Sequence, residues 1–282
     1  MYVDHFVDQL RILAGLPSGA STDRVLNAFR KVRREHYAGR GPWKVLSPHL
    51  GLGRKPTRTP DADPKWLYHA ALLVLDEEKG INIGDPCLWA KSLVLADIPK
   101  GARVLQVGAG VGYYTEILSE IVGLEGNVFA YEVEKALATR AASNVVHLAN
   151  AEIRQGNAAT DLGDIQDIDV IVAFAGVTHI PELWSSRLSP QAHLLLPFTG
   201  NDGWGAMIFA RKTKGRFEAK TIGRCGFYPC KGARSEGLAS LISELFSDEQ
   251  RQEDWHFRLL DEGGIVHIDP SSGNYPLSPP NT

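Results

Sequence analysis

The sequence predicts an α/β fold in which a doubly wound, mostly parallel sheet is covered by helices on both faces. Short apolar runs alternate with helical patterns from about residue 103 to residue 198, as in chains whose parallel strands are joined by crossover helices. The 282 residues are 44% hydrophobic and 22% charged, which is the usual composition of a globular protein. Helical patterns before this region and a further stretch after it predict N-terminal helices and a C-terminal extension.

The first 80 residues are predicted to form an N-terminal segment of helices and loop. Apolar residues with a helical period predict one helix over residues 1–16 and a second from about residue 21, where Ser, Thr and Asp can cap it. Residues 39–64 are rich in Gly, Pro, Arg and Thr, which predicts a loop. Pro64 is suited to begin a third helix, which would end near Gly80.

Residues 81–232 are predicted to form the ligand-binding core. The expected helices are 87–96, 114–122, 135–148 and 181–188, and the expected strands are 103–107, 127–131, 151–155, 169–174 and 193–198. Two later strands, 204–211 and 220–227, are candidates for an antiparallel edge. Residues 233–282 are expected to hold a helix over 236–246 and then a loose tail rich in proline and serine.

Composition and charge disfavour several functional classes. No stretch approaches the ~18 consecutive apolar residues of a membrane span, and the first residues lack the apolar segment of a signal peptide, so we expect a cytoplasmic protein. Three cysteines cannot form a disulfide framework, and Cys225 and Cys230 lack the partners of a zinc site, so no metal is predicted. Residues 1–60 carry eleven Lys and Arg against four Asp and Glu, which we interpret as a solvated surface rather than a nucleic-acid interface.

The strongest local motif is a glycine loop after the first core strand. The segment VLQVGAGVGYY places Gly108, Gly110 and Gly112 between an expected strand and an expected helix. Bare backbone at a helix N-terminus allows a nucleotide-like ligand to approach closely, although a simple turn is an alternative. The dinucleotide fingerprint would require glycine at position 113, where Tyr113 stands. The spacing therefore favours S-adenosylmethionine over NAD or FAD.

Two polar residues follow the next two expected strands. Glu132 ends the second strand, 24 residues after Gly108, where an acid can accept hydrogen bonds from both hydroxyls of a ribose. Asn157 follows the third strand, and its amide can donate and accept hydrogen bonds beside the base of the ligand. A turn residue is the alternative for Asn157.

Taken in order, these motifs resemble the protein-L-isoaspartate O-methyltransferase family. The similar segments are VLQVGAGVGYYTEILSE, VFAYE, RQGNA, DVIVAFAGVTHIPE and LSPQAHLLLPF, with RVLNAFRKVRREHYA before them and FYPCKGARS after them. The likeness covers roughly residues 22–240. It implies a Rossmann-like class I methyltransferase fold, S-adenosyl-L-methionine as the cofactor, and methylation of a carboxylate of a protein or peptide.

The resemblance also implies a set of cofactor-binding residues. They are Ile83, Gly84, Gln106, Val107, Gly108, Ala109, Gly110, Gly112, Tyr113, Glu132, Val133, Asn157 and Ala158. Gln106 departs from the family pattern, because the family has an acid there that contacts the amino-acid part of the cofactor. Without charge assistance this contact is expected to be weaker.

The second departure concerns the family motif Thr-Ile-Ser-x-Pro, whose serine is the active-site residue. This chain has Asn82-Ile83-Gly84-Asp85-Pro86, so Gly84 stands at the serine position. A carboxylate acceptor is ionised at neutral pH and needs no strong base, so the loss of one hydroxyl need not abolish methyl transfer. Asp85 is the candidate catalytic residue, and capping of the helix over 87–96 is its alternative role.

The substrate is therefore open to more than one interpretation. An aspartate beside an incoming carboxylate is repulsive unless it is protonated or paired, which argues for an altered acceptor. The first alternative is a methyltransferase for a specialised peptide or small molecule. The second is a cofactor-binding adaptor without catalysis, and a dinucleotide oxidoreductase is a more distant one. The sequence does not indicate the oligomeric state.

Overall fold

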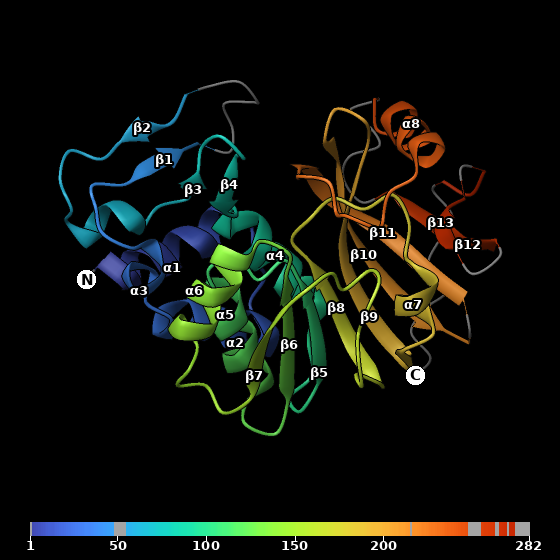
Figure 1. Ribbon diagram of the computed structural model, residues 1–282, viewed down its shortest axis with the longest axis horizontal. Helices are drawn as coiled ribbons and strands as arrows, with labels where there is room; N and C mark the ends of the chain where they lie inside the picture. Colours follow the sequence, from blue (N-terminus) through green and yellow to red (C-terminus); the bar gives the residue numbers. More distant parts are fainter. Residues whose placement is uncertain are drawn as a thin grey trace. The chain divides into compact units, whose positions relative to one another are not determined.

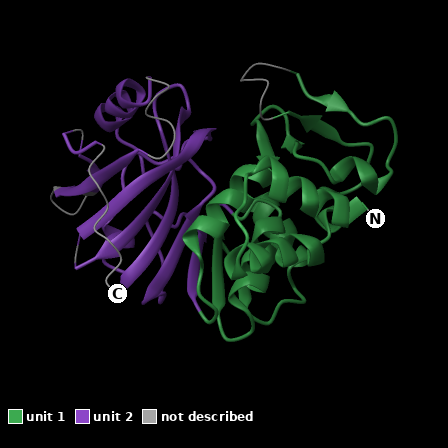
Figure 2. Ribbon diagram, turned by 180° about the vertical axis from the view of Figure 1, so that it is seen from behind, with its two compact units in different colours: residues 1–101, 109–155 green, residues 102–108, 156–282 purple. Residues whose placement is uncertain are grey.

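The computed structural model describes residues 2–47, 55–214, 216–247, 255–262, 265–269 and 271–273. The chain divides into two compact units, shown in Figure 2: unit 1 is Met1–Gly101 with Ala109–Gln155, and unit 2 is Ala102–Gly108 with Gly156–Thr282. This division follows packing, whereas the segments predicted above (1–80, 81–232 and 233–282) follow motifs. The predicted segment boundaries therefore remain a prediction.

Unit 1 begins with the helices α1 (Tyr2–Leu13), α2 (Ala20–Lys31) and α3 (Arg34–Ala38). The first two confirm the predicted helices, and they pack together through buried apolar residues that include Phe6 and Phe29. The predicted cap of α2 was wrong, because Gly19 precedes the helix and no described side chain caps it.

A small antiparallel sheet occupies the region that was predicted as loop and helix. Its strands, in the order β2-β1-β3-β4, are β1 (Lys44–Leu46), β2 (Thr57–Arg58), β3 (Leu72–Asp76) and β4 (Ile81–Ile83). The helix predicted from Pro64 was wrong: only a 3₁₀ helix over Pro64–Leu67 forms before β3. A short apolar run fits a strand as well as a helix, so its pairing partners decide between them.

The rest of unit 1 alternates helices with a parallel pair of strands (Figure 1). The helices are α4 (Pro86–Ala96), α5 (Tyr113–Val122) and α6 (Lys135–Asn144), and the strands are β6 (Asn127–Glu132) and β7 (Ala151–Gln155). Helix α2 packs against α4 and α5, while α5 and α6 both pack against β6 and β7. These elements confirm the predicted order of helices and strands.

Unit 2 contains a larger sheet in the order β13-β12-β11-β10-β9-β8-β5. Its strands are β5 (Arg103–Val107), β8 (Ile168–Ala173), β9 (Leu188–Thr199), β10 (Trp204–Thr213), β11 (Arg216–Gly226), β12 (His256–Glu262) and β13 (Ile265–Ile268). Strands β5, β8 and β9 are parallel, and the later strands are antiparallel, as predicted for the edge.

The helices of unit 2 are α7 (Glu182–Ser185), shorter than predicted, and α8 (Glu236–Leu245). Strands β12 and β13 lie in a region for which the sequence predicted no strand. Residues 274–282, most of the tail predicted to be loose, lie outside the described residues.

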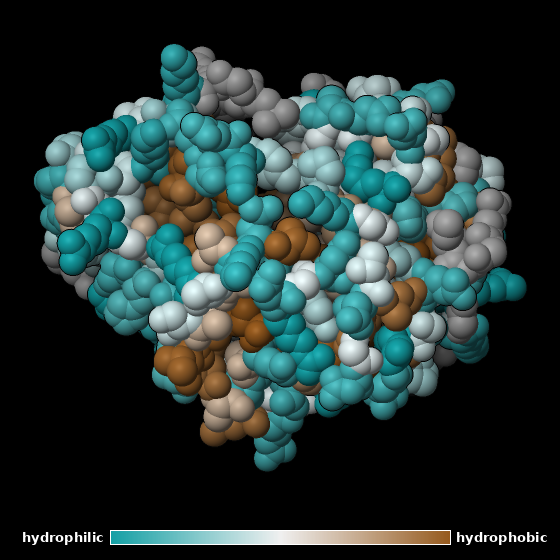
Figure 3. Space-filling view, viewed as in Figure 1, coloured by the Kyte–Doolittle hydropathy of each residue, from teal (hydrophilic) through white to brown (hydrophobic). Residues whose placement is uncertain are grey.

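The parallel strands of unit 2 could be predicted from the sequence because their consecutive residues are buried. Val104 and Leu105 of β5, and Val170 and Ile171 of β8, are fully buried, as expected for strands covered on both faces. The face drawn in Figure 3 is largely hydrophilic, with apolar side chains gathered in separate areas. Within the described part of the chain, no helix has both the length and the apolar character needed to span a membrane.

Candidate functional site

The glycine loop, residues 108–112, connects β5 to α5 and needs glycine for backbone reasons. Gly108, Gly110 and Gly112 have φ values of +90°, +57° and +91°, a region that side chains with a Cβ adopt only with strain. At Gly112 space is also limiting, because an ideal Cβ would lie 2.9 Å from Cγ1 of Val145. At Gly110, by contrast, no described atom beyond its chain neighbours lies within 4 Å of an ideal Cβ. On the side where a Cβ would stand, Gly110 therefore has no close neighbour among the described residues.

The loop leads into the N-terminus of α5. Gly112 precedes the helix, and no side chain in the described ranges caps it. The first N–H groups of a helix have no partner inside the helix, so an uncapped N-terminus can bind acceptor groups of a ligand. Ala109 of the loop packs in a buried cluster with Ala130 of β6 and Ala141 of α6, which holds the loop against these two elements.

Glu132 lies directly against the glycine loop. Its Oε2 accepts a hydrogen bond from the N–H of Gly110 at 2.8 Å, and its Oε1 accepts one from the N–H of Glu134 at 3.0 Å. The side chain is buried, and burial raises the pKa of its carboxyl above the ordinary value against the opposing effect of these N–H donors. An ionised carboxylate offers about four lone-pair sites, so the two bonds leave acceptor capacity for hydroxyl groups. Val133, the next residue, is exposed.

Asp85 makes the contact expected of a helix cap. Its Oδ1 accepts a hydrogen bond from the N–H of Cys87 at 2.9 Å, and Pro86 takes the first position of α4. Burial, and next the charge of Asp85, raises the pKa of the Cys87 thiol to about 12, so this thiol is not a nucleophile at neutral pH. A role of Asp85 toward the acceptor remains a prediction.

Gly84 has two aromatic neighbours, Trp89 and Tyr114, that were not among the predicted site residues. The hydroxyl of Tyr114 donates a hydrogen bond to the carbonyl oxygen of Gly84 at 3.0 Å. An ideal Cβ on Gly84 would lie 2.7 Å from Nε1 of Trp89, so the indole ring occupies the space of a side chain at position 84. Nothing in the local sequence indicated these contacts, because they join positions up to 30 residues apart.

The predicted site residues of unit 2 make contacts that shape their own loops. The amide of Gln106, which is fully buried, donates a hydrogen bond to the carbonyl oxygen of Gly108 at 3.2 Å. The Oδ1 of Asn157 accepts a hydrogen bond from the N–H of Ala159 at 3.0 Å, which is the contact of a turn residue. Ala158 is buried, and its carbonyl accepts a hydrogen bond from the indole N–H of Trp184.

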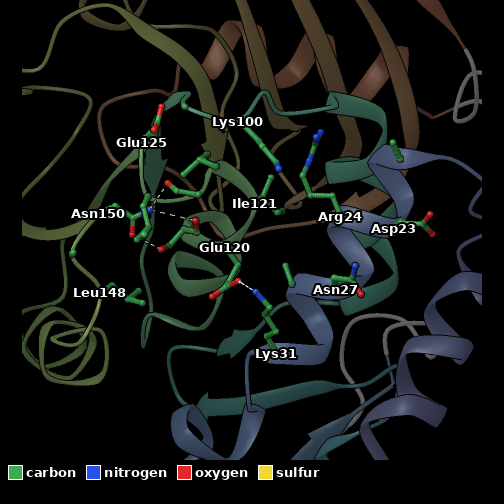
Figure 4. A pocket seen from close by; sticks show the side chains of 18 of the residues that line it. Asp23, Arg24, Asn27, Lys31, Lys100, Glu120, Ile121, Glu125, Leu148 and Asn150 are labelled. Atoms are coloured by element: carbon green, nitrogen blue, oxygen red, sulfur yellow. Dashed lines mark hydrogen bonds and ion pairs between the residues drawn. The ribbon is translucent and has the colours of Figure 1, made fainter.

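A separate groove of about 1190 Å³ lies elsewhere in unit 1, between α2, the end of α5 and residues 147–150 (Figure 4). Figure 4 shows Lys31 and Glu120 facing each other in it, with 2.7 Å between Nζ and Oε2. None of the predicted site residues lines this groove. Among the residues whose positions are described, no group of three His, Cys, Asp or Glu side chains is placed to hold a metal ion.

Comparisons with known proteins agree with the motifs. The family model described as Protein-L-isoaspartate(D-aspartate) O-methyltransferase (PCMT) matches residues 62–235. A protein-L-isoaspartate O-methyltransferase of Koribacter versatilis is 28% identical over 216 residues, which are 76% of this chain and 85% of the relative. Protein-L-isoaspartate O-methyltransferase 2 of Archaeoglobus fulgidus is 29% identical over 155 residues, which are 54% of this chain and 70% of the relative.

Solved structures share the fold. A protein-L-isoaspartate O-methyltransferase has a TM-score of 0.65 and 20% identity, with 82% of this chain and 66% of that chain covered. A Plasmodium falciparum structure in complex with S-adenosyl-L-homocysteine has a TM-score of 0.59 and 18% identity, with 81% of this chain and 97% of that chain covered. The α/β methyltransferase fold is thus confirmed. Since the family model matches more than half of its length, this chain belongs to the protein-L-isoaspartate(D-aspartate) O-methyltransferase family.

Proposed function

We propose that this protein uses S-adenosyl-L-methionine to methylate a carboxylate of a protein or peptide, with isoaspartyl residues as the first acceptor to test. Family membership gives the reaction class and the cofactor. The single observation that carries the proposal at the level of residues is the contact between Glu132 and the open glycine loop. The loop provides bare backbone for the ligand, and Glu132 provides a buried acceptor beside it.

The proposed cofactor site is built around these groups. We propose that the remaining lone pairs of Glu132 accept hydrogen bonds from the ribose hydroxyls. We also propose that the cofactor approaches the protein backbone at Gly110 and at the N-terminus of α5. The other members of the proposed set are Ile83, Gly84, Gln106, Val107, Gly108, Ala109, Gly112, Tyr113, Val133, Asn157 and Ala158. For Asn157, the hydrogen bond of its Oδ1 to the turn leaves its Nδ2 as the group for the base.

The reaction needs little acid–base catalysis from the protein. When bound, S-adenosyl-L-methionine would supply a methyl group on a sulfonium ion for transfer to an oxygen of the acceptor carboxylate. An acceptor carboxylate is already ionised at neutral pH, so no residue has to remove a proton. The residues of the site therefore act by aligning the acceptor and excluding water. We retain Asp85 as the candidate that orients the acceptor, because it stands directly after Gly84.

A second candidate function differs only in the acceptor. Gly84 provides no hydroxyl, and Trp89 fills the space of a side chain there, so this position differs from the serine of the family motif. Methyl transfer to a specialised peptide or a small molecule is this alternative.

We also propose a cytoplasmic location, which the free thiols of Cys87, Cys225 and Cys230 support.

Two measurements test the proposal. S-adenosylhomocysteine should raise the Tm by binding the folded state, whereas NAD should leave it unchanged. Transfer of a labelled methyl group should be seen with an isoaspartyl peptide and not with the matched aspartyl peptide. A Tm shift with NAD alone would contradict the cofactor assignment. Cofactor binding without methylation of the isoaspartyl peptide would favour the second candidate.

A further inference from the structure

Two adjacent tyrosines at the start of α5 differ in what their hydroxyl groups contact. The hydroxyl of Tyr114 donates a hydrogen bond to the carbonyl oxygen of Gly84, with 3.0 Å between the two oxygens. The hydroxyl of Tyr113 is buried and has no hydrogen-bond partner within the described structure. Both side chains are almost completely buried. Of these two hydroxyls, therefore, the one that joins α5 to the segment before α4 is that of Tyr114.

The indole ring of Trp89 holds Gly84 from another side. An ideal Cβ on Gly84 would lie 2.7 Å from Nε1 of this ring, so the ring packs directly against the glycine. Trp89 belongs to α4 and is fully buried, and its ring centroid lies 5.6 Å from that of Tyr114. We call Gly84, Trp89 and Tyr114 the Gly84 clamp. Because its parts are buried, the clamp restricts how far the backbone at Gly84 can shift.

The clamp connects two parts of the proposed site inside unit 1. Tyr114 follows Gly112 of the glycine loop by two positions, on the helix that begins at this loop. Gly84 follows strand β4 and directly precedes the Asp85 cap of α4. An acceptor near Gly84 has to be aligned with a methyl group held at the glycine loop. A misplacement of about 1 Å can slow such a reaction by as much as 100-fold.

We infer that Tyr114 is a positioning residue for methyl transfer, because its hydroxyl fixes the backbone of Gly84 relative to the glycine loop. The inference rests on the proposed function for the location of the acceptor. Tyr114 acts through Gly84 and does not exchange a proton with the substrate. Burial raises the pKa of its phenol well above the ordinary value, so the hydroxyl stays protonated and can donate throughout the neutral range.

The substitution Tyr114→Phe tests the inference, because it removes the hydroxyl and keeps the ring against Trp89. We expect kcat for the isoaspartyl peptide to fall about tenfold, while the Kd for S-adenosylhomocysteine stays within about twofold of the wild-type value. Tyr113→Phe is the matched control for stability and hydrogen exchange, since it removes a neighbouring buried hydroxyl that has no described partner. We expect it to keep or raise the Tm, because no hydrogen bond of the described structure is lost.

A second measurement does not depend on activity. Amide hydrogen exchange of residues 81–90, followed by mass spectrometry, should become about fivefold faster in Tyr114→Phe and stay unchanged in Tyr113→Phe, since a hydrogen bond to the Gly84 carbonyl is lost only in the first variant. A lower Tm with an unchanged kcat would mean that Tyr114 is only structural, and equal exchange in the two variants would mean that it does not hold Gly84. Either result overturns the inference.

These results separate the inference from the proposed function. If the wild-type protein methylates no isoaspartyl peptide, the proposed acceptor is wrong, and the exchange of residues 81–90 by itself then decides whether Tyr114 holds Gly84. If the wild-type protein is active and Tyr114→Phe keeps the wild-type kcat, the proposed function stands and the role of Tyr114 does not.

Discussion

A serine introduced at position 84 tests whether this chain lacks the room for the serine of the family motif. Gly84→Ser adds a Cβ and a hydroxyl directly after β4. The new Cβ would lie 2.7 Å from Nε1 and 3.2 Å from Cδ1 of Trp89, inside the ~3.5 Å at which non-bonded heavy atoms pack without repulsion. Trp89 is fully buried, so its ring has no route into solvent that leaves the packing of α4 intact.

We expect Gly84→Ser to lower the free energy of unfolding by about 2 kcal/mol, because overpacking a well-packed site typically costs ~1–3 kcal/mol. Backbone strain does not contribute, since Gly84 is not among the glycines with a positive φ. The loss therefore measures the contact with Trp89. At about 2–4 °C per kcal/mol for a chain of this size, the Tm should fall by roughly 4–8 °C.

Urea unfolding followed by circular dichroism measures this loss. Gly84→Ala should be destabilised nearly as much, because the clash begins at the Cβ. In a Trp89→Leu background, the same serine should cost at least about 1 kcal/mol less than in the wild-type background, which a double-mutant cycle detects. If Gly84→Ser unfolds at the same urea concentration as the wild-type protein, Trp89 does not fill this space and the reasoning fails.

Further predictions concern the two carboxylates of the site. Glu132→Ala should weaken S-adenosylhomocysteine binding by about 1–3 kcal/mol in calorimetry, because buried donors lose their acceptor; unchanged affinity would place the ribose elsewhere. Burial raises the pKa of Glu132, so its contribution to stability is full below about pH 4.3, the unfolded value, and is lost as the pH rises through the folded pKa. Urea unfolding of Glu132→Gln should lack this pH dependence, and an unchanged profile would contradict the assignment. Asp85→Asn should keep both Tm and turnover if Asp85 only caps α4, whereas a changed turnover at constant Tm would assign it to the acceptor.

The region before the core shows where sequence patterns were insufficient. The apolar run at Leu72–Asp76 fits a helical period as well as a buried strand, and the sequence pattern predicted a helix from Pro64. Pairing with β1 and β4 made this run a strand. Strand β1 lies in the segment that was predicted as loop. Its three residues are too few to show a periodic pattern, so the sequence did not indicate it. In both cases the pairing with other strands, which a periodic pattern does not show, decided the structure.

The sequence by itself determined the features that depend on neighbouring residues. Continuous apolar runs predicted β5 and β8, because strands buried on both faces need no alternation. The positive φ values of the loop required Gly108, Gly110 and Gly112, because a Cβ is strained there whatever surrounds it. These constraints act within a few residues, and so they can be read from the order of residues along the chain.

Only the tertiary structure decided which side chains meet at the proposed site. Tyr113 and Tyr114 are identical residues beside each other, yet one hydroxyl reaches the carbonyl of Gly84 and the other has no described partner. The glycine at position 84 reads as a lost hydroxyl in the sequence, whereas in the structure it is the space that Trp89 fills. Each of these contacts depends on how α4 and α5 pack, and packing between elements is set by the whole fold rather than by local sequence.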